Sequence, residues 1–182
     1  KSVDFVARST AILDSNVECL KAIESEIPLL SREKVLRSIS KLKKSIAVSG
    51  THGKTTTSSM LSLVLREAGL KPSFIIGGEV NEIGTGAVWD DGENLVIEAD
   101  ESDASFLGLK RQLSIITNLE EDHLEYFGGF EPLYQAFVKF GTETDGLVVL
   151  GIDDDNSLQL SKDIEATTVG FNPLSDWKID LI

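Results

Sequence analysis

A short glycine-rich turn between an apolar strand and a helix constrains this chain more than any other feature of its sequence. Residues 46–49 (Ile-Ala-Val-Ser) are typical of a buried strand, and residues 50–57 (Gly-Thr-His-Gly-Lys-Thr-Thr-Thr) follow directly and open a helix. In such a unit, backbone N–H groups and the positive end of the helix dipole converge on one point, which suits a phosphate group. Two glycines alone could form no more than a tight turn, but a strand, a lysine, a threonine and a helix in register favour a phosphate-binding loop.

The side chains of this loop indicate ATP with Mg²⁺ as the ligand. Lys54 supplies a mobile positive charge for the β- and γ-phosphates, and the hydroxyl of Thr55 can coordinate the metal ion. The widespread form of the motif has a further glycine where Val48 stands, so the shortened loop argues against a generic kinase or GTPase. The predicted nucleotide-binding residues are Gly50, Thr51, His52, Gly53, Lys54, Thr55 and Thr56.

Apolar strands alternate with amphipathic helices along most of the chain. Strands are predicted at residues 3–6, 27–30, 46–49, 74–76, 95–99, 113–117, 147–150 and 167–170, and helices at residues 16–24, 31–42, 54–68, 131–140 and 156–162. The helix at 54–68 has Met60, Leu61, Val64, Leu65 and Ala68 as its apolar face. This alternation predicts an α/β fold with a mostly parallel sheet covered on both faces.

The length of 182 residues, 41% of them hydrophobic, is enough for one ordinary globular domain and part of a second. A lysine-rich stretch at residues 41–45 is the predicted boundary, which separates residues 1–43 from residues 44–182. The chain starts without Met in a strand-like segment and ends in an alternating, strand-like run at residues 177–182. We therefore expect it to be a fragment.

Charge, hydrophobicity and cysteine content limit the partners and the cellular location that we expect. Lys and Arg number 17 against 30 Asp and Glu, and the net charge of −13 argues against a nucleic-acid partner. The sequence has no run of about 18 apolar residues, so no membrane span is expected. Cys19 is the single cysteine, and the N-terminus lacks a targeting pattern, which together predict a cytoplasmic protein.

Two further strand ends carry groups suited to metal chemistry. Glu98 interrupts an otherwise apolar strand, where an unpaired carboxylate is costly and a cation removes that cost. The surrounding carboxylates could instead form a solvated acidic loop, which is our interpretation of residues 90–93. His123 follows the next buried strand by a few residues. A parallel sheet would bring Lys54, Glu98 and His123 to one edge.

At these residues the sequence resembles the Mur ligase family of ATP-dependent enzymes that form amide bonds. The resemblance is carried by residues 50–57, 75–78 (Ile-Ile-Gly-Gly), 98–106 (Glu-Ala-Asp-Glu-Ser-Asp-Ala-Ser-Phe) and 117–124 (Thr-Asn-Leu-Glu-Glu-Asp-His-Leu). It implies that residues 44–182 are most of the family's central ATP-binding domain, with the C-terminal domain absent. Residues 1–43 would be the end of a Rossmann-like N-terminal domain that binds a UDP-sugar.

The resemblance also implies a reaction. Within the family, the similarity is greatest to members that add L-alanine to UDP-N-acetylmuramate in peptidoglycan precursor synthesis. ATP would phosphorylate the muramyl carboxylate, and the amine of L-alanine would displace phosphate from the acyl phosphate. Lys54, Glu98 and His123 are the implied catalytic residues. The chain alone is not expected to turn over, because the C-terminal domain brings the amino acid and further catalytic groups.

Ligand contacts follow from the same resemblance. Thr55 and Glu98 would hold Mg²⁺ (or Mn²⁺) near the phosphates, and His123 would hold a second metal ion near the carboxylate. Ser9 and Thr10, in a loop that matches the family at residues 8–12, would contact the UDP-sugar. Asn118 would shape the substrate site.

Three alternatives remain at this point. A family member that reattaches recovered murein peptides to UDP-muramate is expected to have Tyr where Ser102 stands. A phosphate-loop phosphotransferase would hold its metal with an Asp rather than with Glu98 and His123. A non-catalytic nucleotide-binding module predicts that Glu98→Ala leaves the ATP affinity unchanged in the presence of Mg²⁺.

Overall fold

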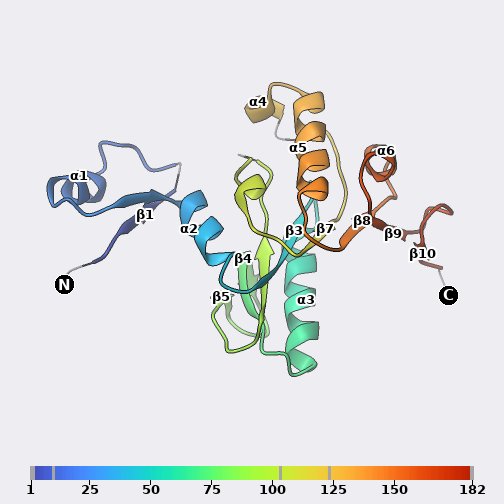
Figure 1. Ribbon diagram of the computed structural model, residues 1–182, viewed down its shortest axis with the longest axis horizontal. Coiled ribbons are helices and arrows are strands. Elements are labelled where there is room, and N and C mark those ends of the chain that lie inside the picture. Colours follow the sequence, from blue (N-terminus) through green and yellow to red (C-terminus); the bar gives the residue numbers. More distant parts are fainter. Residues whose placement is uncertain (1–2, 10, 103, 123, 181–182) are drawn as a thin grey trace.

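The computed structural model describes residues 3–9, 11–102, 104–122 and 124–180. Within them, a large sheet of eight strands has the order β10-β9-β8-β7-β3-β6-β4-β5, and a separate small sheet pairs β1 with β2 (Figure 1). In chain order, the strands of the large sheet are β3 (Lys44–Ser49), β4 (Ser73–Val80), β5 (Thr85–Val88), β6 (Asn94–Glu98), β7 (Leu113–Ile116), β8 (Val148–Gly151), β9 (Thr167–Gly170) and β10 (Trp177–Lys178).

The strand directions confirm the predicted, mostly parallel α/β fold. Every neighbouring pair in the large sheet is parallel except β4 with β5. Strand β3 lies between β6 and β7, with Val48 opposite Glu98 and Ser49 opposite Ile116. The carboxyl ends of β3, β6 and β7 therefore meet at one edge of the sheet, where ligands bind in open α/β folds.

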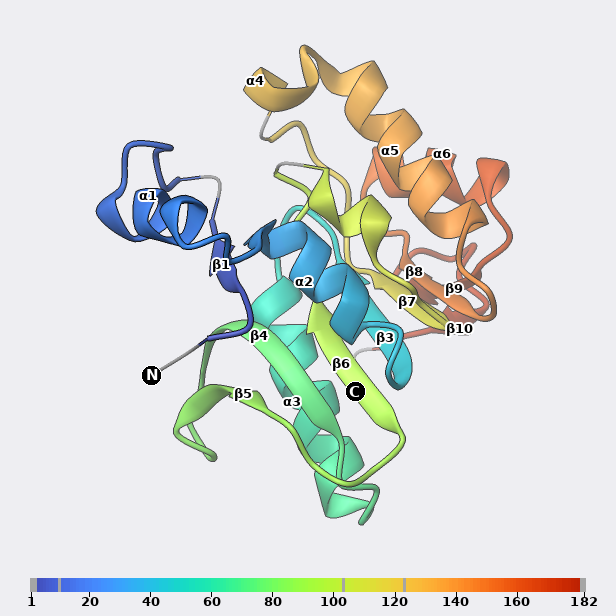
Figure 2. The ribbon, with the colours of Figure 1, turned by 60° about the vertical axis from the view of Figure 1, so that its left-hand side comes forward.

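Helices cover both faces of this sheet. Helix α3 (Lys54–Glu67) packs on the face that carries Val48 and Val96, and Figure 2 shows α2 and α3 on opposite sides of the sheet. The other face carries the larger apolar cluster, to which the 3₁₀ helix η1 (Ser105–Gly108), α5 (Phe130–Thr142) and α6 (Asp155–Asp163) contribute. None of the described helices is long and apolar enough to cross a lipid bilayer.

The apolar face predicted for α3 is wrong in part. Ser58 and Ser62 are the fully buried residues of this helix, and Leu61 and Leu65 pack on the sheet beside them. Met60 and Val64 are 62% and 63% exposed, and Ala68 is exposed as well. Residues 58, 61, 62 and 65 form one stripe at helical spacing, and the small serines at two of these positions allow the helix to approach the sheet.

The first 40 residues contain β1 (Val6–Arg8), α1 (Val17–Glu24), β2 (Leu29–Ser31) and α2 (Arg32–Ile39). The predicted strand at residues 3–6 begins too early. Both helix starts are confirmed, because Asn16 accepts a hydrogen bond from Glu18 N at 2.9 Å and Ser31 accepts one from Lys34 N at 3.2 Å.

Helix α2 lies against the unit that is built around the large sheet. Its Leu36 and Ile39 pack on the apolar cluster of that unit, and the backbone N–H of Lys110 donates to the Ser40 hydroxyl at 2.9 Å. The boundary between residues 43 and 44 stays a prediction. Three described elements were not predicted, namely β5, η1 and α4 (Leu124–Phe127), and each has only four residues.

We predict that Phe106→Ala lowers the free energy of unfolding by about 3–5 kcal/mol. Phe106 is 1% exposed, and its ring lies 5.4 Å from that of Phe137 and 5.0 Å from that of Phe140. Met60→Ala is the control, because this exposed side chain should cost no more than about 0.5 kcal/mol. Urea unfolding of the two variants checks the prediction. A large loss in both variants would contradict the exposed position of Met60, and a small loss in both would contradict the buried position of Phe106.

Candidate active site

The turn after β3 depends on two glycines. Gly50 has a φ of +127°, and a Cβ atom there would lie 2.2 Å from Thr117 Oγ1. Gly53 has a φ of +81° and is the N-cap of α3. Both conformations belong to the region that side chains disfavour, and at Gly50 the residues that follow β7 leave no space for a side chain either. The spacing of the two glycines in the sequence therefore follows from the shape of the loop.

The loop is fixed to the residues that follow β7. The side-chain amide of Asn118 donates to His52 O at 2.9 Å and accepts from His52 N at 2.8 Å (hydrogen bonds that we call the Asn118 clamp). Thr117 Oγ1 donates to His52 O at 2.6 Å, and Thr51 N donates to Asn118 O at 3.2 Å. Asn118 therefore holds the loop backbone, and its predicted contact with substrate stays a prediction.

Helix α3 begins where an anion would sit. Its first intrahelical hydrogen bond runs from Thr57 N to Gly53 O at 2.9 Å. The first N–H groups of any helix have no partner within it, so those of residues 54–56 are available to a ligand at the mouth of the loop. Together with the helix dipole, they make this end of α3 suited to phosphate oxygens.

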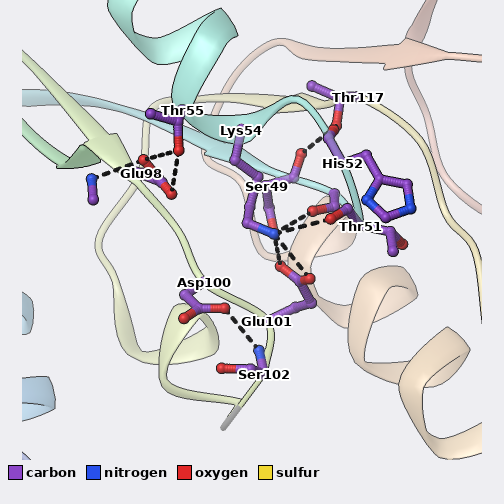
Figure 3. Close-up of polar contacts among 12 residues, drawn as sticks. Ser49, Thr51, His52, Lys54, Thr55, Glu98, Asp100, Glu101, Ser102 and Thr117 are labelled. Atoms are coloured by element: carbon purple, nitrogen blue, oxygen red, sulfur yellow. Dashed lines mark hydrogen bonds and ion pairs between the residues drawn. The ribbon is translucent and has the colours of Figure 1, made fainter. Parts of the chain in front are cut away.

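Lys54 lies folded back over the loop (Figure 3). Its ammonium Nζ donates to Gly50 O at 2.8 Å and to Thr51 O at 3.2 Å, and it is 3.0 Å from the Glu101 carboxylate. The side chain of Lys54 is 13% exposed, and that of Glu101 is 1% exposed. Burial raises the pKa of the Glu101 carboxyl above its usual value, while Lys54 acts in the opposite direction.

Sequence reasoning did not select Glu101 as a site residue. The available signal was the run of carboxylates after β6, but a run of this kind does not tell which side chain turns inward. Asp100, its neighbour, instead accepts a hydrogen bond from Ser102 N at 3.1 Å within its own turn (Figure 3).

Thr55 and Glu98 face each other from α3 and β6. Thr55 Oγ1 lies 3.0 Å from each oxygen of the Glu98 carboxylate, and Gly77 N donates to Glu98 Oε2 at 2.8 Å. A Cβ atom on Gly77 would lie 3.0 Å from Glu98 Oε1, so the missing side chain leaves room for the carboxylate. A hydroxyl and a carboxylate at this distance are a pair of hard oxygen ligands of the kind that Mg²⁺ prefers.

The structure gives less support to the remaining predicted site residues. Thr10 and His123 lie outside the described residues. Ser9 follows β1, and its hydroxyl accepts a hydrogen bond from Ala11 N at 3.3 Å. In the part of the chain that the structure describes, no cluster of three or more His, Cys, Asp or Glu residues is arranged to hold a metal ion. Lys54, Thr55, Glu98 and Asn118 are brought together at one sheet edge.

The fold and the loop define the class of phosphate-loop α/β domains. Residues 48–180 match the sequence model of the Mur ligase middle domain, and the chain therefore belongs to the Mur ligase family.

Individual relatives agree with this membership. The chain is 41% identical over 97% of its length to UDP-N-acetylmuramate--L-alanine ligase from Syntrophus aciditrophicus, and it spans 38% of the length of that relative. The crystal structure of UDP-N-acetylmuramate-alanine ligase from Thermotoga maritima matches 92% of the chain and 38% of its own chain, with a TM-score of 0.81 and 32% identity. A Neisseria ligase for UDP-N-acetylmuramate and L-alanyl-γ-D-glutamyl-meso-diaminopimelate matches 91% of the chain and 58% of its own, with a TM-score of 0.75 and 25% identity.

We predict that Asn118→Ala weakens ATP binding about thirtyfold, because two hydrogen bonds worth roughly 1 kcal/mol each no longer shape the loop. Asn156→Ala is the matched control. The amide of Asn156 holds the same segment at Leu119 O, at 3.0 Å, without contacting the loop. Calorimetric titration with ATP compares the two variants, and equal affinities would show that the loop keeps its shape without the Asn118 clamp.

Proposed function

We propose that the protein joins L-alanine to the carboxylate of UDP-N-acetylmuramate at the expense of ATP, in peptidoglycan precursor synthesis. One observation carries the proposal: Lys54 and Thr55 start a helix behind a phosphate loop, and Thr55 Oγ1 lies 3.0 Å from the carboxylate of Glu98. Family membership and the names of the relatives supply the substrates. Because the chain spans 38% of the relative from Syntrophus, the activity is proposed for the protein as a whole.

ATP is assigned to the loop between β3 and α3. The N–H groups at the start of α3 and the ammonium of Lys54 would receive its phosphates. Gly50, Thr51, His52, Gly53 and Thr56 complete the backbone around them. Buried strands on both sides and the Asn118 clamp hold this loop in place, so little ordering is left for binding to supply.

The residues beside the loop fit a magnesium ion. Thr55 and Glu98 supply a hydroxyl and a carboxylate whose oxygens already lie together, and Gly77 N–H orients the carboxylate. A bound Mg²⁺ (or Mn²⁺) neutralises phosphate charge during phosphoryl transfer. We assign His123 to a second metal ion, on family resemblance alone.

The chemistry proceeds in two displacements. A carboxylate oxygen of UDP-N-acetylmuramate attacks the γ-phosphorus, ADP leaves, and an acyl phosphate forms. The amine of L-alanine then attacks the carbonyl carbon, loses a proton, and expels inorganic phosphate. Lys54 and the helix N–H groups stabilise the charge that collects on the phosphoryl oxygens in the first step. Ser9 and Thr10 are assigned to the UDP-sugar, and Asn118 to the substrate side of the loop.

A murein-peptide ligase is the nearest alternative. The Thermotoga enzyme, which is an alanine ligase, has both a higher identity and a higher TM-score than the Neisseria peptide ligase. Position 102 is Ser, where the peptide ligases are expected to carry Tyr. These observations favour L-alanine. The proposal places the reaction in the bacterial cytoplasm and involves no nucleic acid, in keeping with the net charge of −13.

The first test is phosphate release from ATP by the whole protein. We expect release only when both UDP-N-acetylmuramate and L-alanine are present. In Lys54→Ala, the rate of release should fall at least about a thousandfold, because a charge that stabilises the transition state is removed. Colorimetric phosphate detection with each substrate omitted in turn measures this. Release that does not need L-alanine would overturn the proposal, and release that needs L-alanyl-γ-D-glutamyl-meso-diaminopimelate in place of L-alanine would indicate a peptide ligase.

A second test addresses the metal. Glu98→Gln is expected to raise the Mg²⁺ concentration needed for half-maximal ATP binding by about tenfold or more. Glu93→Gln is the matched control, because Glu93 precedes the opposite end of β6 and forms an exposed ion pair with Lys44. An unchanged Mg²⁺ requirement in Glu98→Gln would favour a nucleotide-binding module without this metal site.

A further inference from the structure

The ammonium of Lys54 is already fully occupied in this structure. A lysine ammonium has three N–H donors. Lys54 directs them to Gly50 O at 2.8 Å, to Thr51 O at 3.2 Å and to the Glu101 carboxylate at 3.0 Å (Figure 3). A phosphate group can therefore reach this ammonium only if at least one of these acceptors gives it up.

Of these acceptors, Glu101 is the one that carries a charge, and it is buried. Its side chain is 1% exposed, and its carbonyl accepts a hydrogen bond from Ala104 N at 3.2 Å. The segment is anchored before it by Ala99, whose N–H donates to Val48 O at 2.8 Å, and after it by the buried ring of Phe106. The backbone of Glu101 is therefore held and its carboxylate is buried, whereas Lys54 has a flexible four-carbon stem that can turn toward the mouth of the loop.

The charges of this arrangement oppose nucleotide binding. The carboxylate of Glu101 and the phosphates of a nucleotide carry the same sign and would share one ammonium. The attraction between Lys54 and Glu101 at 3.0 Å is strong where water is scarce. Phosphate binding must therefore offset the free energy that is needed to withdraw Lys54 from Glu101. The same pairing keeps the buried lysine charge compensated while the loop holds no phosphate.

We propose that Glu101 is a positioning residue that holds Lys54 on the loop and competes with the nucleotide phosphates for its ammonium. Glu101 then weakens the binding of ATP and ADP and speeds the release of ADP. This inference rests on the proposed function, because it takes ATP and ADP as the ligands of the loop.

The test is calorimetric titration of the whole protein with ATP and with ADP in the presence of Mg²⁺. Glu101→Gln keeps the shape of the side chain and removes its charge, so we expect about fivefold tighter binding, equivalent to roughly 1 kcal/mol. Stopped-flow measurement should show slower ADP release. A residue that is only structural would not give a gain in affinity when it is replaced.

Two controls separate the contact from general electrostatics. Asp100→Asn removes the same charge from the adjacent residue, which bonds Ser102 N rather than Lys54, and should change the affinity less than about twofold. In a Lys54→Met background, Glu101→Gln should no longer tighten binding, because the competition needs the ammonium. If Glu101→Gln does not fold, Glu101→Asp, which withdraws the carboxylate by one methylene, should show a smaller gain in the same direction.

The possible failures are distinguishable. Unchanged or weaker ATP binding by folded Glu101→Gln, with normal binding by the wild-type protein, would overturn this inference and leave the proposed function intact. An equal gain in Asp100→Asn would also overturn it. Failure of the wild-type protein to bind ATP would overturn the proposed function and this inference together.

Discussion

The pairing of β3 with both β6 and β7 is the constraint on which the rest of this structure depends. It places Val48 beside Glu98 and Ser49 beside Ile116, so the segments that follow these three strands must share one edge of the sheet. The loop after β3 is then closed on one side by the Asn118 clamp and on the other by Glu98 and Glu101. A change in the register of β3 would therefore separate Lys54 and Thr55 from the carboxylates of Glu98 and Glu101.

Much of the fold was predictable because the strands of a parallel sheet are apolar on both faces. Residues 46–49, 95–99 and 113–117 contain almost only apolar and small side chains, and each corresponds to a central strand. The buried face of α3 was not predictable in this way. Two serines lie against the sheet, and no hydrophobicity pattern marks a serine as buried; Met60 and Val64 are apolar but face outward. Packing distance decided this face rather than side-chain polarity.

The candidate site was predictable where backbone geometry dictates residue type and not where it depends on side-chain direction. Gly50 is required by its φ and by the closeness of Thr117, so the motif is visible in the sequence. Glu101 differs from the adjacent Asp100 in that its carboxylate is buried and contacts Lys54, and the order of residues in the sequence does not show this. Asn118 was expected on the substrate side, yet its amide is bonded to the backbone of the loop, a contact that joins residues far apart in sequence.

That distance orders the events of folding. Asn118 lies 66 residues beyond His52, and closing so long a segment is slow and must await the pairing of β7 with β3. During synthesis, β3 and α3 leave the ribosome well before the residues that shape the loop between them. A nascent chain that ends before residue 117 thus has the sequence of a phosphate loop without the hydrogen bonds from Thr117 and Asn118 that hold its backbone, and the binding site is completed only after β7 has been made.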